Sequence, residues 1–309
     1  MPEILIVNGV TCMNGVLLID KPVGMTSHDV VYKLRRALET KRVGHTGTLD
    51  PDVTGLLVML VGEATKLTEI LQEREKSYRA EVTLGFSTTT EDKSGDVVKS
   101  SSVDGISTED IDEVIQTFSG EYNQQVPLYS SVKVEGRKLY FYAREGIPVE
   151  RPFKTVHIHD LKRTSEPELK DGNISFNIDV TCSKGTYIRT LAVDIGRALG
   201  VEAHMSGLIR TGSCGFHLKN AISLSEINPD KIIPIIDCLE GMPEIDLEKR
   251  HNLLFDVTHG QKVKACHVED LLGKKVPRVL FRNGNKPIGI YRYMGEEKDE
   301  YKTFKMFNL

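Results

Sequence analysis

Runs of apolar residues, some continuous and some alternating with polar ones, predict the elements of the first 245 residues. The continuous run at 16–19 is typical of a buried strand, and the run at 56–61 fits a buried strand or the start of a helix. Alternation at 78–86 and 174–182 predicts strands with one buried face, with Tyr78 on the inward side. Helical spacing follows two predicted capping boxes, at residues 26–29 and 107–110, and recurs at 64–75 and 191–199. This mixture of strands and helices indicates an α/β body.

Three segments depart from this pattern. Residues 87–107 are polar and rich in hydroxyl groups, which predicts a loop. Residues 126–154 interleave lysines and arginines with aromatic residues, a mixture that suits contact with RNA and also occurs in surface hairpins. Beyond a boundary near residues 240–250, short β-like runs separated by turns such as Asn283-Gly284 predict a small β domain.

Composition and charge narrow the class of protein. A charged fraction of 27% and a hydrophobic fraction of 39% are typical of soluble globular chains. We find neither an apolar run of ~20 residues nor a secretory leader, so we expect a cytoplasmic protein with no membrane contact. Five scattered cysteines predict free thiols, and no histidine or cysteine pair has zinc spacing, so no metal is expected. The net charge of −4 hides a basic segment, because residues 250–309 hold 12 Lys and Arg against 7 Asp and Glu. That segment is either a phosphate-facing surface or a solvated face.

A loop of restricted shape occupies residues 44–55, with the sequence GHTGTLDPDVTG. Its glycines and Pro51 limit the backbone, and Asp50 stands at its centre. Asp50 could be a turn residue that caps local amides. It could also be the nucleophile of a haloacid-type phosphatase, because residues 50–54 fit D-x-D-x-[TV]. That motif should directly follow an apolar strand, whereas residues 45–49 intervene here. A third interpretation depends on resemblance to a family.

Several blocks, in order along the chain, resemble the TruB-type tRNA pseudouridine synthases. They are residues 15–24 (GVLLIDKPVG), 44–51, 55–57, 62–66, 76–78 (KSY), 129–140 (YSSVKVEGRKLY) and 184–191 (KGTYIRTL). The resemblance implies a pseudouridine-synthase fold of mixed α/β class, with a central, largely antiparallel sheet and a C-terminal PUA-like β domain. It also implies isomerisation of uridine 55 in the T loop of tRNA, after the base is flipped out, without a cofactor or metal.

The same resemblance implies roles for single residues. Asp50 matches the catalytic aspartate, Tyr78 the tyrosine that lies against the flipped base, and Arg189 the arginine that pairs with the aspartate. Such a pair would lower the pKa of Asp50 and keep it ionised. The other matches are substrate-binding positions: His45, Tyr187, Leu208, Lys21 and Lys66. Lys21 is expected to meet phosphate or to support the catalytic loop, and Lys66 to lie close to the RNA backbone.

These observations predict three parts of the chain. Residues 1–12 are an extension, because family members commonly begin near residue 13; residues 13–245 are the catalytic domain, with 126–154 as a basic RNA-contacting excursion; residues 246–309 are a PUA-like RNA-binding domain. The predicted partner is the T stem-loop of tRNA, and the chain is expected to act as a monomer. A noncatalytic tRNA-binding module of the same fold is the alternative. The joint presence of Asp50, Tyr78 and Arg189 favours the enzyme.

Overall fold

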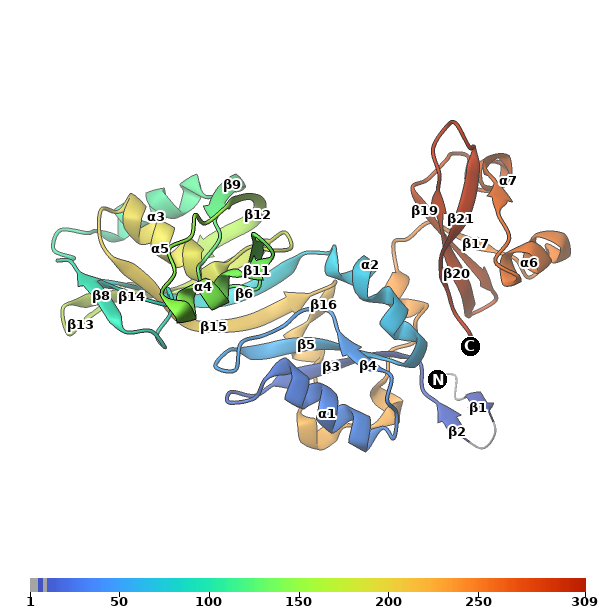
Figure 1. Cartoon of the computed structure of the whole chain (residues 1–309), viewed down its shortest axis with the longest axis horizontal. Coiled ribbons are helices and arrows are strands. Elements are labelled where there is room, and N and C mark those ends of the chain that lie inside the picture. The colour runs from blue at the N-terminus through green and yellow to red at the C-terminus, as the bar shows by residue number, and fades with distance from the viewer. Residues whose placement is uncertain (1–4, 8–9) are drawn as a thin grey trace.

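The computed structural model describes residues 5–7 and 10–309. Figure 1 shows a body crossed by one long sheet and, at the right, a separate C-terminal domain. In the predicted N-terminal extension, β1 (Leu5–Val7) pairs antiparallel with β2 (Val10–Cys12). The other residues of that extension lie outside the described ones.

A ten-stranded sheet forms the centre of the body, in the main order β3-β5-β15-β6-β14-β12-β9. β4 lies beside β5, β16 beside β15 and β13 beside β14. Its strands are β3 (Gly15–Lys21), β4 (Val43–His45), β5 (Thr54–Val61), β6 (Lys76–Leu84), β9 (Gly120–Gln125), β12 (Phe153–Arg163), β13 (Glu168–Lys170), β14 (Asn173–Cys182), β15 (Ala203–Ser213) and β16 (Phe216–His217). Neighbours are antiparallel except β5 and β15, which run parallel where Thr54 and Gly55 face Ile209 and Arg210. The predicted mixed α/β body with a largely antiparallel sheet is confirmed.

β5 is buried along almost its whole length because both of its faces are covered. Leu56, Val58 and Leu60 point into one hydrophobic cluster, and the alternate residues Leu57, Met59 and Val61 point into another. A strand with two buried faces has a continuous apolar sequence. The run at 56–61 is therefore a strand.

The helices cover the sheet where the sequence predicted them. α1 (Ser27–Ala37) and α3 (Thr108–Thr117) begin at the two predicted capping boxes. α3 and α5 (Ile188–Ala198) lie over the left half of the sheet in Figure 1 and bury apolar residues against β6, β12 and β14. The remaining helical segments of the body are η1 (Gly62–Leu67), α2 (Thr68–Gln72), α4 (Leu139–Glu145), η2 (Leu218–Asn220), η3 (Leu224–Glu226), η4 (Pro229–Lys231) and η5 (Asp237–Leu239).

The stretch predicted as a loop at 87–107 instead contains a hairpin. β7 (Phe86–Thr88) pairs with β8 (Val97–Ser100), and the turn between them is bound to β15 through Met205. Asp92 shapes the turn by accepting hydrogen bonds from Ser94 N (3.0 Å) and Thr90 Oγ1 (2.7 Å). β8 is exposed at every position, so the hairpin has no apolar alternation that the sequence could display.

The C-terminal domain is a five-stranded sheet in the order β17-β19-β20-β21-β18. Its elements are β17 (Glu244–Asp246), α6 (His251–Thr258), β18 (Val263–Lys264), α7 (Ala265–Leu272), β19 (Arg278–Asn283), β20 (Lys286–Tyr293) and β21 (Glu300–Met306). The three predicted β-like runs lie in β19, β20 and β21, so the predicted small β domain is confirmed. The two helices were not predicted.

Candidate active site

Asp50 is an exposed carboxylate on a loop whose neighbouring residues are anchored in the core. Leu49 and Val53 are buried in the cluster that packs under α1. The Ser27 hydroxyl, at the first residue of α1, accepts a hydrogen bond from Leu49 N (2.9 Å) and donates one to Leu49 O (3.2 Å). Val53 N donates to Asp50 O at 3.1 Å and closes the turn. The start of α1 therefore holds the backbone immediately before Asp50.

A buried arginine holds the same loop from the sheet. Arg210 of β15 is 1% exposed, and it donates to Leu56 O (2.7 Å), Gly47 O (3.1 Å) and Thr48 O (3.4 Å). Burial lowers its pKa, and within the described residues it forms no ion pair, so backbone carbonyls supply its hydrogen-bond acceptors. Gly55, at φ +103°, passes so close to the Arg210 backbone that any side chain there would collide. Sequence analysis did not assign Arg210 a role, because a single arginine in a strand does not reveal which carbonyls it will meet.

Lys21 supports the loop from a third side. Its side chain is 0% exposed, and Nζ donates to the carbonyl oxygens of Met25 (2.7 Å), Pro22 (2.9 Å) and Pro51 (3.2 Å). Burial lowers the pKa of this amine, while the carboxylates of Asp52 and Asp50 act in the opposite direction. The expectation that Lys21 contacts RNA phosphate is therefore wrong, because its ammonium is enclosed and fully hydrogen-bonded. The alternative expectation, support of the catalytic loop, agrees with the bond to Pro51.

Tyr78 and Leu208 lie on the strands next to this loop. Tyr78 of β6 faces Arg210 in the β6–β15 ladder, and Leu208 faces Ala80. Burial raises the pKa of Tyr78 to about 12, although the nearby Arg210 guanidinium acts to lower it. The phenol, which is protonated at neutral pH even at its ordinary pKa, thus becomes still harder to ionise. Leu208 is partly buried and packs against two hydrophobic clusters, the one beneath α3 and α5 and the one beneath α1.

Tyr187 and His45 are held by their elements and not by their side-chain tips. Tyr187 is the residue just before α5 and makes no side-chain capping bond; the buried Gln124 amide of β9 accepts from Tyr187 N and donates to Tyr187 O, both at 2.8 Å. His45 ends β4, and its Nδ1 is buried without a hydrogen-bond partner among the described residues. Burial lowers the pKa of this imidazole, and Arg210 adds to the effect, so His45 is neutral at physiological pH. Gln124 was not found from the sequence.

Arg189 is paired with Asp92 and not with Asp50. Its guanidinium donates to Asp92 Oδ2 (3.1 Å), Thr90 O (3.4 Å) and Tyr129 O (3.0 Å). The prediction that Arg189 pairs with Asp50 is therefore wrong. Its counter-ion is Asp92, in the hairpin turn within the stretch predicted as a loop. Burial opposes ionisation of Asp92, but hydrogen bonds from Ser94 and Thr90 and the charge of Arg189 outweigh it and lower the Asp92 pKa. Arg189 thus joins the hairpin turn to the start of the excursion.

The basic excursion at 126–154 contains a short hairpin followed by a helix. β10 (Lys133–Val134) pairs with β11 (Arg137–Lys138), and α4 follows. Tyr142 is buried and its hydroxyl donates to Val134 O (3.0 Å). Lys138 Nζ and the Arg144 guanidinium carbon lie 5.7 and 5.6 Å from the centre of the Tyr140 ring. Part of the aromatic content is therefore structural, and part forms a surface with the cations.

Lys66 fastens the C-terminal domain to the body. Its Nζ donates to Glu63 Oε2 and to Met306 O, both at 2.6 Å. The buried Glu63 carboxylate also binds Arg42 and accepts from Asn308 N (3.0 Å). Burial opposes ionisation of Glu63, but these donors lower its pKa. The expected contact of Lys66 with the RNA backbone stays a prediction; in the structure its two hydrogen-bond acceptors both belong to the protein.

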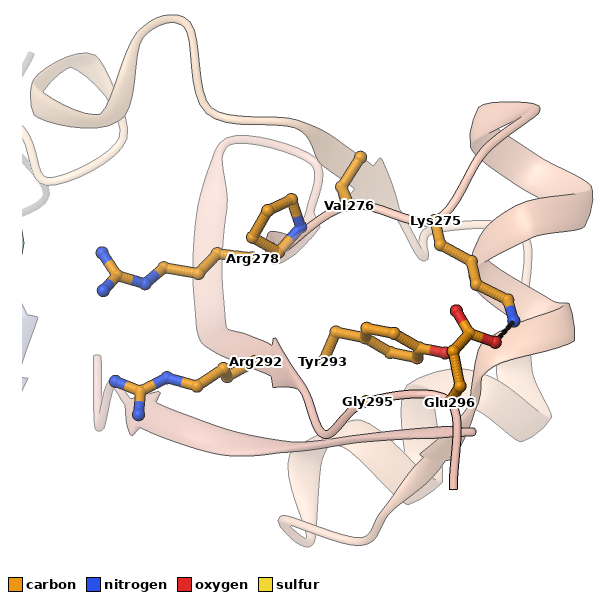
Figure 2. A pocket seen from close by; sticks show the side chains of 8 residues that line it. Lys275, Val276, Arg278, Arg292, Tyr293, Gly295 and Glu296 are labelled. Carbon is orange, nitrogen blue, oxygen red and sulfur yellow. Dashed lines mark hydrogen bonds and ion pairs between the residues drawn. The ribbon is translucent and has the colours of Figure 1, made fainter. Parts of the chain in front are cut away.

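The basic charge of the C-terminal domain is partly used in docking. Arg278 pairs with Glu73 (2.8 Å) and Lys305 with Glu69 (3.2 Å), so two cations of this domain bind the α2 segment. Figure 2 shows a pocket of this domain, in which Arg278 and Arg292 extend side by side and Lys275 is bound to Glu296 at the other end. The Arg292 guanidinium carbon lies 4.0 Å from the centre of the Phe304 ring, and Arg292 has no carboxylate partner in the described chain. The free positive surface is therefore smaller than the sequence count suggests.

The remaining features are the metal-ligating side chains, the cysteines and the apolar helices. The described residues contain no group of three or more His, Cys, Asp or Glu that could hold a metal ion. Cys182, Cys214, Cys238 and Cys266 are free thiols, as predicted, while the side chain of Cys12 lies outside the described ones. Among residues 5–7 and 10–309, no helix combines the length and the apolar character needed to cross a membrane.

Solved structures similar in fold extend over nearly the whole chain. One, an H/ACA RNP bound to a substrate RNA containing 2'-deoxyuridine, superposes with a TM-score of 0.68 at 23% identity and covers 96% of this chain and 86% of that one. A Cbf5-Nop10-Gar1 complex gives a TM-score of 0.68 at 24% identity, over 96% of this chain and 85% of that one. At this identity the likeness concerns the fold alone.

Sequence comparison defines the class and then the family. Residues 35–188 match the family described as TruB family pseudouridylate synthase (N terminal domain), and residues 189–232 match the tRNA pseudouridylate synthase B C-terminal domain. The chain thus falls in the class of pseudouridylate synthases. The tRNA pseudouridine synthase B of Bacillus cereus is 44% identical over 298 residues, covering 95% of this chain and 97% of that protein. The Staphylococcus haemolyticus protein of the same name is 42% identical over 305 residues, covering 96% and 99%. The chain belongs to the TruB family.

Proposed function

We propose that this chain isomerises a uridine of tRNA to pseudouridine, at position 55 of the T loop, with Asp50 as the catalytic carboxylate. The observation that carries the proposal is the set of hydrogen bonds that hold the Asp50 loop in place. Ser27, Arg210 and Lys21 hold its loop from three sides while the carboxylate itself stays exposed. A reactive group held rigidly at a surface open to a large substrate suits chemistry on a flipped base. Membership of the TruB family supplies the reaction type.

The reaction rearranges bonds within one nucleotide. The bond from ribose C1′ to N1 of uracil breaks, the base turns, and a bond forms from C1′ to C5, which loses its proton while N1 gains one. No oxidant, reductant or second substrate enters the balance. Asp50 would act in its ionised form, either as a nucleophile or by accepting a proton at the sugar, and both routes need it close to the glycosidic bond.

The surrounding residues would receive the uridine. Tyr78, a neutral phenol at physiological pH, can stack on the base through its ring. Leu208 and Tyr187 would line the uracil site, and the neutral His45 would hold a T-loop nucleotide. Arg189 is retained in the proposed site in the position that its bonds to Asp92 and Tyr129 give it, between the hairpin turn and the excursion.

The phosphatase alternative finds no support in the geometry of the loop. Its nucleophilic aspartate should stand at the end of an apolar strand, whereas β4 ends at His45 and Asp50 lies in the loop before β5. The described residues also offer no carboxylate cluster for the magnesium ion that such chemistry uses. The noncatalytic alternative is left to experiment.

The test is release of tritium from unmodified tRNA labelled at C5 of uridine, with carbodiimide mapping of the modified position. Wild type should modify position 55, and Asp50→Asn should abolish activity without loss of tRNA binding. Asp52→Asn is the matched control, since Asp52 is also an exposed carboxylate on the same loop, and it should remain active. An inactive wild type would favour the noncatalytic module. An active Asp50→Asn variant would remove Asp50 from the mechanism.

A further inference from the structure

Lys76 stands at the start of β6, two residues before Tyr78. Residues two apart on a strand point to the same face, so Lys76 shares the face of the proposed base-stacking tyrosine, about 7 Å along the strand. In the ladder, Lys76 faces Cys182 of β14 and Ser213 of β15.

The Lys76 side chain is partly buried and has no anionic partner among the described residues. Its one hydrogen bond is to Gln72 O at 3.4 Å, and it forms no ion pair with any described residue. Its side chain lies against the Asp50 loop, because a Cβ added to Gly47 would lie 3.7 Å from Lys76 Cε and 3.5 Å from Arg210 Nη1. Burial lowers its pKa, and the positive charges of Arg210 and Lys184 act in the same direction.

Further lysines surround the adjoining turn. Lys184 is exposed in the turn after β14, and Lys154 approaches that turn so closely that any side chain at Gly185 would overlap its Nζ. Of the two glutamates just before Lys76, Glu73 pairs with Arg278 (2.8 Å), and the largely exposed Glu75 lies 3.6 Å from His159. Among the described residues, none of these three lysines forms an ion pair, so cations without a carboxylate partner gather at this turn.

We propose that Lys76 and Lys184 form a site for one backbone phosphate of the RNA strand that carries the target uridine. The proposal rests on the proposed function and names a contact of the same site. A phosphate fits because it supplies the acceptor oxygens that a partly desolvated ammonium lacks. One nucleotide can span the distance from a base stacked on Tyr78 to a phosphate at Lys76.

The test removes the charge first from single phosphates of the RNA and then from Lys76 of the protein. Binding of T-arm hairpins is measured with the Asp50→Asn variant, so that no turnover occurs, and single phosphates are replaced by neutral methylphosphonates along the loop. At one linkage next to the target uridine, affinity should fall about tenfold. Adding Lys76→Met should lower affinity for the unmodified hairpin by a similar factor and abolish the effect of that one linkage. The slope of log K against log salt should fall by about 0.7 to 0.9.

Lys170→Met is the matched control, since Lys170 is an exposed lysine on β13 at the left end of the body in Figure 1, and it should change neither quantity. If Lys76→Met stays sensitive to the same linkage, or no linkage matters, the phosphate site is refuted. Lys76→Met should unfold at the same or a higher temperature than its parent, because burial disfavours the charge; a variant that unfolds earlier or fails to fold would show a structural role and also overturn the proposal. If the wild type forms no pseudouridine but the effect of that one linkage on binding is still seen, the proposed function alone would be contradicted.

Discussion

Replacing Ser27 by alanine tests whether the start of α1 positions Asp50. The hydroxyl of Ser27 is buried and exchanges two hydrogen bonds with the backbone of Leu49, the residue before Asp50. The substitution removes one oxygen atom and leaves the Leu49 N–H and C=O without partners. We therefore expect the loop to shift and the carboxylate to lose its position.

The size of the effect follows from those two backbone groups. An unsatisfied buried donor or acceptor costs about 1–3 kcal/mol, so two of them, partly relieved by relaxation, should cost about 2–4 kcal/mol of unfolding free energy. Displacement of a catalytic group by about 1 Å can lower a rate by about a hundredfold. We expect kcat to fall at least tenfold while KM for tRNA changes little, because Ser27 is buried and cannot touch RNA.

The neighbouring Thr26 provides the control. Its hydroxyl caps the same helix by accepting from Asp29 N (3.1 Å), and in the described chain it forms no hydrogen bond to the Asp50 loop. Thr26→Ala should cost about 1 kcal/mol of stability and leave kcat unchanged. Thermal unfolding and single-turnover tritium release of the two variants separate stability from positioning.

Two outcomes would refute this reasoning. If Ser27→Ala lowers the unfolding temperature and leaves kcat intact, Asp50 does not depend on the bond to Leu49. If Thr26→Ala slows the reaction as much as Ser27→Ala does, the effect arises from helix α1 as a whole.

Three further predictions concern charged side chains. The pKa of Glu63 is lowered from 4.5, so its contribution to stability, about 1–3 kcal/mol, is present above pH 4.5 and is lost as pH falls through the lowered value. Glu63→Gln should therefore unfold at a lower temperature than wild type at pH 7, and the difference should close in acid; a difference that does not change with pH would contradict this. Arg189→Ala should speed tryptic cleavage within residues 126–154, seen by mass spectrometry, because the bond to Tyr129 O is lost, and unchanged cleavage would count against that tether. Arg292→Met should reduce the salt slope of tRNA binding by about 0.7 to 0.9. Arg278→Met, which breaks the ion pair with Glu73, should instead cost up to about 1 kcal/mol of stability, and equal slopes in the two variants would refute the distinction.

Much of the fold could be read from local pattern. The two capping boxes start α1 and α3, and alternation along 174–182 gives β14, whose even-numbered residues are all buried. The hairpin of β7 and β8 was missed, because a polar hairpin held by turn side chains carries no apolar period. Helices α6 and α7 are only eight residues each, too short for their periodicity to be distinctive.

Assignment of the cations shows where local pattern ends. Lys21, for which both phosphate contact and loop support were expected, binds the loop at Pro51 O; Lys66 binds Met306 O of the C-terminal domain; Arg189, expected at Asp50, binds Asp92. Arg210 had no predicted role and holds three carbonyls of the Asp50 loop and of β5. A charged side chain takes the acceptors that folding brings within hydrogen-bond reach, and these come from distant parts of the chain.

The sequence by itself determined the family, the loop that bears Asp50, and the strands and helices whose burial repeats along the chain. It could do so because periodic burial and short motifs are properties of neighbouring residues. Only the tertiary structure decided that Ser27, Lys21 and Arg210 hold the loop, that Arg189 binds Asp92, and that Lys76 is left without an anionic partner. Those facts depend on which strands pair and in which register, and hydrogen bonds and ion pairs form only between groups that the fold places within about 3 Å of each other.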